Sequence, residues 1–282
     1  MKKILILIFP LLGVWACNST PLSSDPPNDN GDTVETASAL YDAKPTKPNG
    51  LEIPRKLQGN DGKILRRVGY TASYNAANRI PNWVAWHLTA SHVGGHYNRN
   101  NEVFHEDPEV SNPRAYDSDY RSSGYDRGHM CPSGDNKWNK EAQEQSFLFT
   151  NICPQRHNLN TGAWNDVELQ CRAWAKRYGD LYIVCGPVLY DQQHKTIGRN
   201  RVVVPEAFFK VVLRKHDNYY KAIGFVYENK GASRDMSRYV RSIDDVEQLT
   251  GFDFFSALPD NIEEKIEKSA NLRDWYPLRE IK

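Results

Sequence analysis

The side chains with the clearest chemical potential lie close together, between residues 125 and 168. Histidine is the side chain that ordinarily titrates near neutral pH, so His129 suits the removal of a proton from water. Arg127 carries a permanent positive charge that can meet negative charge building on an anionic substrate. Asn160 and Glu168 offer oxygen atoms, the ligands that a hard cation such as Mg²⁺ prefers. These residue types meet the needs of phosphodiester hydrolysis: a base for water, a cation for phosphate and a place for a metal.

Asn160 and Glu168 stand at the start of a predicted helix. Apolar residues recur at steps of three and four over residues 161–178, and Gly179 ends the pattern. Asn160 suits the N-cap of this helix. Residues 160 and 168 fall on nearly the same face, roughly 12 Å apart along the axis at about 1.5 Å per residue. Both cannot easily ligate one small ion directly, so we expect Glu168 to hold a metal-bound water.

Three motifs occupy this stretch, in order. Residues 126–129 read Asp-Arg-Gly-His, residues 150–155 read Thr-Asn-Ile-Cys-Pro-Gln, and residues 160–168 read Asn-Thr-Gly-Ala-Trp-Asn-Asp-Val-Glu. At these residues the sequence resembles the DNA/RNA non-specific endonuclease family of the ββα-metal superfamily. The family patterns Asp-Arg-Gly-His, Ser/Thr-Asn-x-x-Pro-Gln and Asn-x-Gly-x-Trp-x-x-x-Glu match without a break. The resemblance covers most of residues 60–230.

The resemblance implies a metal-dependent nuclease that cleaves DNA and RNA with little sequence preference and leaves 5′-phosphates. His129 would be the general base. Asn160 would be the direct protein ligand of Mg²⁺, with waters completing the shell and Mn²⁺ able to replace it. Glu168 would hold that ion through water.

Three further residues complete the site that the resemblance implies. Asn151 would help to orient the site, with bracing of the backbone as the alternative. Arg127 would contact phosphate or stabilise the transition state, and the alternative is an ion pair with Asp126. Arg99 is the best match for an upstream catalytic arginine of the family.

The pattern of elements predicts one α+β domain over residues 51–282, without internal repeats or a second linker. From the resemblance we expect the ββα-metal nuclease fold, a central, mostly antiparallel sheet flanked by helices. The predicted strands are 82–88, 181–185 (stopped by Gly186-Pro187), 208–213 and 219–227, with a turn around 215–218 between the last two. The predicted helices are 137–147, 161–178 and 262–272.

The N-terminal residues predict export. Two lysines precede an apolar run over residues 4–16, which is shorter than the roughly 20 residues needed to span a bilayer. Cys17 follows directly, so residues 1–17 are typical of a bacterial lipoprotein signal with Cys17 lipidated; ordinary signal cleavage is the alternative. Residues 18–50 are polar and predict a disordered tether. We therefore expect an exported protein, lipid-anchored to a bacterial membrane at the cell surface or in the periplasm.

The net charge of +1 neither demands nor excludes a nucleic-acid partner, because a local patch suffices. We expect DNA and RNA as substrates, and the sequence leaves the oligomeric state open, a homodimer included. The basic residues that flank the motifs and are candidates for a phosphate-tracking groove are Arg114, Arg121, Lys137, Lys140, Arg156, Arg172, Lys176 and Arg177.

Two other functions remain open at this point. The first is a catalytically inactive lipoprotein that binds nucleic acid at the cell surface. The second is a zinc hydrolase built on His87, His92 and His96.

The remaining cysteines are Cys131, Cys153, Cys171 and Cys185. An oxidising compartment would permit disulfides among them in any of three connectivities, which the sequence does not distinguish. Without a Cys-x-x-Cys pair, a cysteine zinc site is not expected.

Overall fold

The computed structural model describes residues 50–56, 62–190, 193–217 and 219–276. The predicted signal segment 1–17 with Cys17, and all but the last residue of the predicted tether 18–50, lie outside these residues and stay predictions. Within the described ranges, no helix combines the length and apolar character that crossing a bilayer requires.

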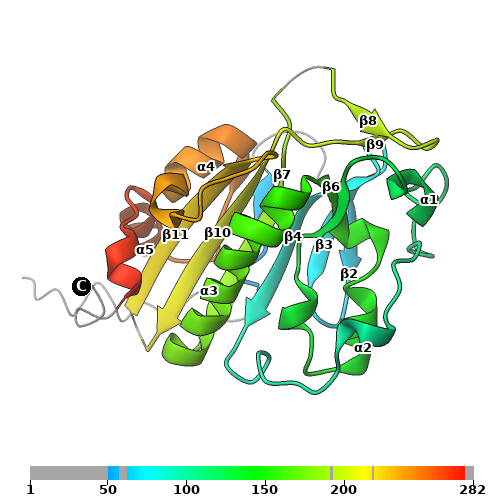
Figure 1. Ribbon diagram of the computed structural model, residues 1–282. Coiled ribbons are helices and arrows are strands. Elements are labelled where there is room, and N and C mark those ends of the chain that lie inside the picture. The colour runs from blue at the N-terminus through cyan, green and yellow to red at the C-terminus, as the bar shows by residue number, and fades with distance from the viewer. Residues whose placement is uncertain (1–49, 57–61, 191–192, 218, 277–282) are drawn as a thin grey trace, which may run out of the picture. The chain divides into compact units, whose positions relative to one another are not determined.

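A seven-stranded, fully antiparallel sheet runs through the described domain, which confirms the α+β prediction (Figure 1). In order across the sheet, its strands are β12 (Val240–Arg241), β11 (Tyr219–Glu228), β10 (Ala207–His216), β7 (Leu181–Val188), β4 (Ile80–Leu88), β3 (Thr71–Asn75) and β2 (Lys63–Arg66).

The predicted strands are all present, and each is one to four residues longer than predicted. β10 and β11 form the expected hairpin, paired as far as His216 opposite Tyr219. β7, however, continues through Gly186-Pro187 to Val188. Its pairing with β4 stops at Cys185, so a proline two residues later removes no hydrogen bond from that ladder.

The sheet buries an apolar core on each face, because successive side chains of a strand point to opposite sides. On β10, Phe208 and Val212 enter one core, and Phe209 and Val211 enter the other. α3 (Trp164–Tyr178) lies across the first face and contributes Trp164 and Trp174 (Figure 1). α4 (Ile243–Thr250) and α5 (Asp260–Glu267) contribute Ile243 and Ile262 to the second core.

The predicted helices are present but shorter than expected at two places. The helix expected over 137–147 is α2 (Lys140–Gln145), which begins after Asn139, whose side chain accepts a hydrogen bond from Ala142 N (3.0 Å). The helix expected over 262–272 is α5, followed by a separate 3₁₀ turn. Other short elements are α1 (Asp117–Tyr120) and two strand pairs, β1 (Arg55–Lys56) with β13 (Phe252–Asp253) and β8 (Thr196–Ile197) with β9 (Val202–Val203). The 3₁₀ segments are Arg99–Asn101, Ser133–Asp135, Phe149–Asn151, Met236–Tyr239 and Leu272–Trp275.

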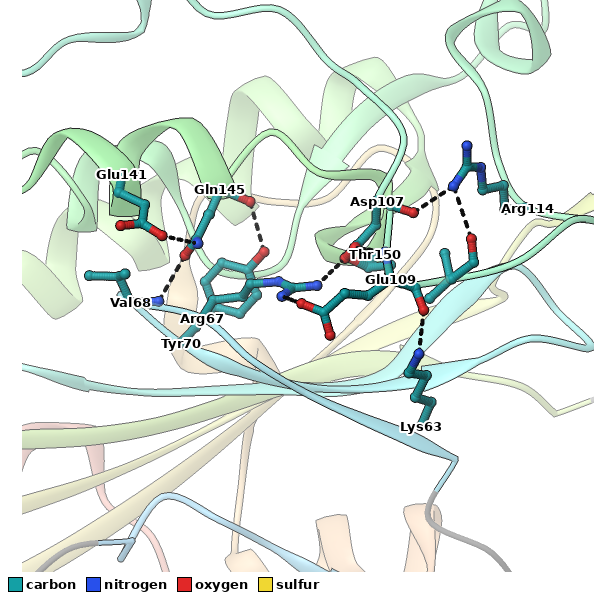
Figure 2. A network of polar contacts seen from close by, with 11 residues as sticks. Lys63, Arg67, Val68, Tyr70, Asp107, Glu109, Arg114, Glu141, Gln145 and Thr150 are labelled. Carbon is teal, nitrogen blue, oxygen red and sulfur yellow. Dashed lines mark hydrogen bonds and ion pairs between the residues drawn. The ribbon is translucent and has the colours of Figure 1, made fainter.

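A network of charged side chains anchors the long connection between β4 and α1 (Figure 2). Asp107, which is fully buried, accepts hydrogen bonds from Arg67 Nη2 (2.5 Å) and Thr150 Oγ1 (2.6 Å). Arg67 also pairs with Glu109, and Arg114 donates to the Asp107 carbonyl oxygen (2.7 Å). The connection is therefore held on a defined course although it contains little regular structure.

Candidate active site

Three successive elements carry the predicted site residues. β5 (Asp126–His129) and β6 (Ile152–Gln155) pair antiparallel as a separate two-stranded ribbon, and α3 follows β6 along the chain. Gly128 of β5 pairs with Cys153 of β6, and a Cβ atom at position 128 would come within 2.4 Å of Gln155 Oε1. A larger residue between Arg127 and His129 would therefore collide with the Gln155 side chain.

A cavity of about 490 Å³ opens beside this ribbon and the start of α3. It brings together all the predicted site residues except Asn151, and four of the residues that line it are cations. The lining residues are Asn98, Arg99, Arg127, His129, Pro132, Ser133, Gly134, Lys137, Asn160, Thr161, Asn165, Glu168 and Arg172. A polyanion entering this cavity would meet positive charge from several sides.

His129 lies in an apolar setting at the edge of the cavity, 9% exposed. The rings of Phe104 and Phe147 pack against its imidazole, with centroids 5.3 and 5.0 Å away. Nε2 is buried, with no hydrogen-bond partner among the described residues. Burial, together with the charge of Arg99, lowers the pKa of His129 to about 3. The imidazole is therefore neutral at physiological pH and able to accept a proton.

The neutral state of His129 predicts an acid-sensitive fold. The unfolded chain takes up a proton at the ordinary histidine pKa of about 6.5, whereas the folded chain does so only near 3. Between these values the unfolded state binds more protons, so the free energy of unfolding decreases as the pH falls. At about 1.4 kcal/mol per unit, the His129 contribution between pH 7 and pH 4.5 is about 2–3 kcal/mol.

Urea unfolding of the wild type and of His129→Ala at the two pH values measures this contribution. Other groups titrate in both proteins, so the difference between the two pH dependences isolates His129. Equal losses of stability on acidification would contradict a neutral, buried His129 in the folded state.

Asn160 lies in a single π-helical turn, Leu159–Ala163, that precedes α3. The prediction that it caps the helix was wrong, because α3 begins after Ala163 without a side-chain cap. Its Nδ2 instead donates to Asp126 Oδ2 (2.9 Å), an oxygen that His157 Nδ1 also contacts (2.9 Å). A carboxylate only accepts, so this bond identifies the Asn160 nitrogen and leaves Oδ1 available as a ligand. The turn is irregular at Gly162, and π-type turns often occur at functional sites.

Glu168 lines the same cavity two turns further along the helix and is half-buried. Burial raises the pKa of its carboxyl to about 7, and the charges of Lys210 and Arg172 oppose this rise. The Glu168 carboxylate and the Asn160 amide form an all-oxygen donor set. A hard divalent cation that keeps several waters fits such a set, and the cavity has room for those waters.

Lys210 on β10 is a buried charge that sequence reasoning missed. Its Nζ lies 4.6 Å from the ring centroid of Trp164 and 5.0 Å from that of Trp86. Burial alone would lower the pKa of Lys210, but nearby acidic groups, including Glu168, outweigh this effect and raise it. A lysine at an inward-facing, otherwise apolar position of a predicted strand was the signal that could have revealed it.

Sequence reasoning also missed Asp135, which holds Arg172 in place in the cavity wall. It is buried and accepts hydrogen bonds from Arg172 Nη1 (2.8 Å) and Trp86 Nε1 (3.1 Å). Arg172, which the sequence suggested only as part of a basic flank, is thereby fixed beside Glu168.

The two predicted arginines both face the cavity. Arg127 does not pair with Asp126, so that alternative was wrong; its partner is Asp117, with Nη2 2.5 Å from Oδ1. Arg99 begins a 3₁₀ segment, with its guanidinium carbon 5.7 Å from the Phe147 ring centroid. The cavity therefore has one arginine constrained by an acid and another that enters from the β4–α1 connection.

Asn151 does not line the cavity. It is fully buried, and its Oδ1 accepts from Cys131 N (2.8 Å) while its Nδ2 donates to the carbonyl oxygens of Cys131 (2.9 Å) and Ser146 (2.8 Å). All three bonds go to the backbone around the end of β5. The side chain thus braces the segment that follows His129.

Of the basic residues that flank the motifs, Lys137 and Arg172 line the cavity. Several others have local partners: Arg121 pairs with Asp117 (2.7 Å) and Lys140 with Glu144 (3.6 Å). Of the eight flanking basic residues that the sequence suggested for a groove, two therefore line this cavity.

The zinc alternative fails on geometry. His87 Nε2 contacts Asp180 Oδ1 (2.8 Å), and His92 stacks on Trp138 with its Nδ1 directed to the His87 carbonyl oxygen (3.1 Å). The His96 ring instead packs at a tilt against that of Tyr97, with the centroids 4.2 Å apart. Within the described ranges, the only group of three or more His, Cys, Asp or Glu side chains that converge as ligands lies elsewhere and contains no histidine.

The four cysteines after Cys17 are buried and carry free thiols. These four cysteines therefore form no disulfide with one another, and none of the three possible connectivities is present. Burial raises the pKa of all four thiols, which keeps them protonated and unreactive.

Known proteins are similar to this chain in sequence and in fold. The sequence profile of the DNA/RNA non-specific endonucleases matches residues 47–261. Mitochondrial nuclease EXOG of Danio rerio is 34% identical over 206 residues, which cover 68% of this chain and 60% of that protein. Nuclease C1 of Cunninghamella echinulata is 32% identical over 216 residues, covering 71% of this chain and 85% of that protein. The chain thus spans little more than half the length of its EXOG relatives and most of nuclease C1.

A solved structure agrees with the sequence comparison. The crystal structure of the EndoG/EndoGI complex superimposes with a TM-score of 0.66 at 31% identity, covering 71% of this chain and 89% of that one. The matched residues 47–261 include the β5–β6–α3 unit and every residue that lines the cavity. The chain belongs to the DNA/RNA non-specific endonuclease family and has its ββα-metal fold.

Proposed function

We propose that this protein hydrolyses DNA and RNA endonucleolytically, with little sequence preference and with a divalent cation, Mg²⁺ or Mn²⁺, as its cofactor. One observation carries the proposal: a neutral, buried histidine shares a cation-lined cavity with an oriented amide oxygen and a carboxylate. Family membership supports the same activity. The four cations among the lining residues are consistent with recognition of the phosphate backbone.

His129 supplies the base. Its neutral imidazole takes a proton from a water molecule, which attacks the phosphorus atom while the bond to the 3′ oxygen breaks and that oxygen takes a proton from a second water. The products would then be a 5′-phosphate and a 3′-hydroxyl. Phe104 and Phe147 exclude bulk water from one side of the imidazole and so keep its charge state neutral before the reaction.

The cations of the cavity hold the phosphate. Arg127, kept in place by Asp117, and Arg99 can donate to the non-bridging oxygens as their charge increases. Asn160 and Glu168 would hold the metal ion, Asn160 directly and Glu168 through water. When bound, the ion would neutralise charge on the phosphate and on the leaving oxygen.

The test is an assay of the full chain on plasmid DNA and on a structured RNA. We expect cleavage of both in Mg²⁺, none in EDTA, and 5′ ends that resist kinase labelling until they are dephosphorylated. Asn160→Ala is expected to raise the Mg²⁺ concentration for half-maximal rate by at least about tenfold. Asn261→Ala, an exposed asparagine on α5, is the matched control.

A folded wild-type chain that binds nucleic acid but cleaves neither substrate in Mg²⁺ or Mn²⁺ would overturn the proposal. That result would favour the inactive binding protein. Cleavage that persists in EDTA would instead remove the cofactor from the proposal.

A further inference from the structure

Three carboxylates converge on the face of the sheet opposite the active-site cavity. Asp244 and Glu247 lie on α4, and Glu267 lies at the end of α5. One oxygen from each lies within 4.8 Å of an oxygen from each of the others. The two helices, separated in sequence by β13 and a loop, thus bring three acids to one point.

Glu267 is the residue that sets this cluster apart from ordinary surface acids. It is only 7% exposed, and its Oε1 is buried without a hydrogen-bond partner among the residues that the structure describes. Glu263, one helical turn earlier, has a buried, unpartnered Oε1 as well. A buried carboxylate oxygen without a partner costs free energy, and a bound cation would recover part of that cost.

We propose that Asp244, Glu247 and Glu267 form a binding site for a divalent cation of the Ca²⁺ class that joins α4 to α5. Ca²⁺ binds oxygens at about 2.3–2.6 Å, so two ligands on opposite sides of it lie about 4.8 Å apart, the span that these oxygens do not exceed. Mg²⁺ keeps several of its waters and is usually bound through one or two carboxylates, so a set of three protein carboxylates suits Ca²⁺ better.

The exposure of the three residues suits a cation that enters from solvent. Asp244 is exposed, Glu247 half-buried and Glu267 buried, so the site has an open side for the waters that complete a Ca²⁺ shell. Glu247 Oε1 also accepts from Phe254 N (2.7 Å), which fixes the direction of that carboxylate. Arg55, a cation close enough to affect Glu263, is itself paired with Asp253 (2.6 Å).

The concentration of negative charge at this cluster favours a bound cation. The acidic side chains of Glu247, Glu263, Asp244 and Asp253 lie close to the buried Glu267. Like charges one turn apart on α5 repel each other. A divalent cation would offset both the desolvation and the repulsion.

The test uses the full chain with Asn160→Ala, which removes the proposed catalytic metal site. Calorimetric titration with CaCl₂ is expected to detect one site, and Ca²⁺ is expected to raise the melting temperature. Glu267→Gln and Glu247→Gln should each weaken Ca²⁺ binding by at least about tenfold, because each removes a charged ligand. Glu264→Gln, on the same helix but paired with Lys268 (3.7 Å), should leave it unchanged.

Asp244→Asn covers the case in which a buried substitution unfolds the chain, since Asp244 is exposed. Loss of Ca²⁺ binding in this variant, with an unchanged melting temperature in EDTA, supports the proposal. No Ca²⁺ binding in the Asn160→Ala chain, or equal binding after Glu267→Gln, overturns it. Tighter binding of Mg²⁺ than of Ca²⁺ overturns the assignment of the ion.

Discussion

Replacement of His129 by alanine is expected to slow cleavage of DNA and of RNA by about 10²–10⁴-fold, the usual contribution of a general base. The imidazole is neutral at working pH, because burial and Arg99 lower its pKa to about 3. In the proposed mechanism it accepts a proton from water without first having to lose one. Initial rates at saturating Mg²⁺ and several substrate concentrations should show the loss in kcat, since the proposal assigns the water to His129 and phosphate binding to the arginines.

The control for this prediction is a histidine remote from the cavity. His216 is exposed at the end of β10, and His216→Ala should keep the wild-type rate. Near neutral pH, far-ultraviolet circular dichroism of His129→Ala should match that of the wild type. A residual rate within about tenfold of the wild type would show that another group removes the proton.

Replacement of Arg67 by methionine is expected to lower the free energy of unfolding by about 3–5 kcal/mol. The Arg67 side chain is 6% exposed and that of Asp107 is fully buried, so the change leaves a carboxylate without its counter-ion in the protein interior (Figure 2). Thr150 would remain as its only side-chain hydrogen-bond donor among the described residues. Urea unfolding at constant pH measures the loss.

Lys140→Met provides the contrast, because Lys140 forms an exposed pair with Glu144 (3.6 Å) and such pairs contribute at most about 1 kcal/mol. The double variant Arg67→Met, Asp107→Asn should recover part of the stability, since it removes the uncompensated charge. Similar losses from Arg67→Met and Lys140→Met would mean that the buried network contributes no more than a surface pair. The site should respond as well, because the connection anchored by Asp107 also carries Arg99.

The fold was predictable where a local pattern determined it. The apolar period of α3 and the left-handed Gly179 (φ +88°) that ends it are both readable along the chain. The end of β7 was not predictable, because a proline interrupts a strand only where its nitrogen would have to donate a hydrogen bond to a neighbouring strand. That condition depends on where pairing with β4 stops, a tertiary fact.

The site was predictable in its residue types and less so in their partners. Motif order indicated His129, Asn160 and Glu168, and all three face one cavity. The bond from Asn160 to Asp126 crosses 34 positions, and neither propensity nor periodicity carries such information. For the same reason the pairing of Arg127 with Asp117 was missed: the adjacent acid in the motif looked sufficient.

The hydrogen bond between Asn160 and Asp126 restricts which residues the two positions can exchange. An amide is a side chain that offers an oxygen ligand and a donor from the same planar group. Aspartate at position 160 would keep the oxygen but place two carboxylates in contact, and serine would shorten the reach. We therefore expect a change at one of these positions to be tolerated only with a matching change at the other, although the two residues lie in different motifs.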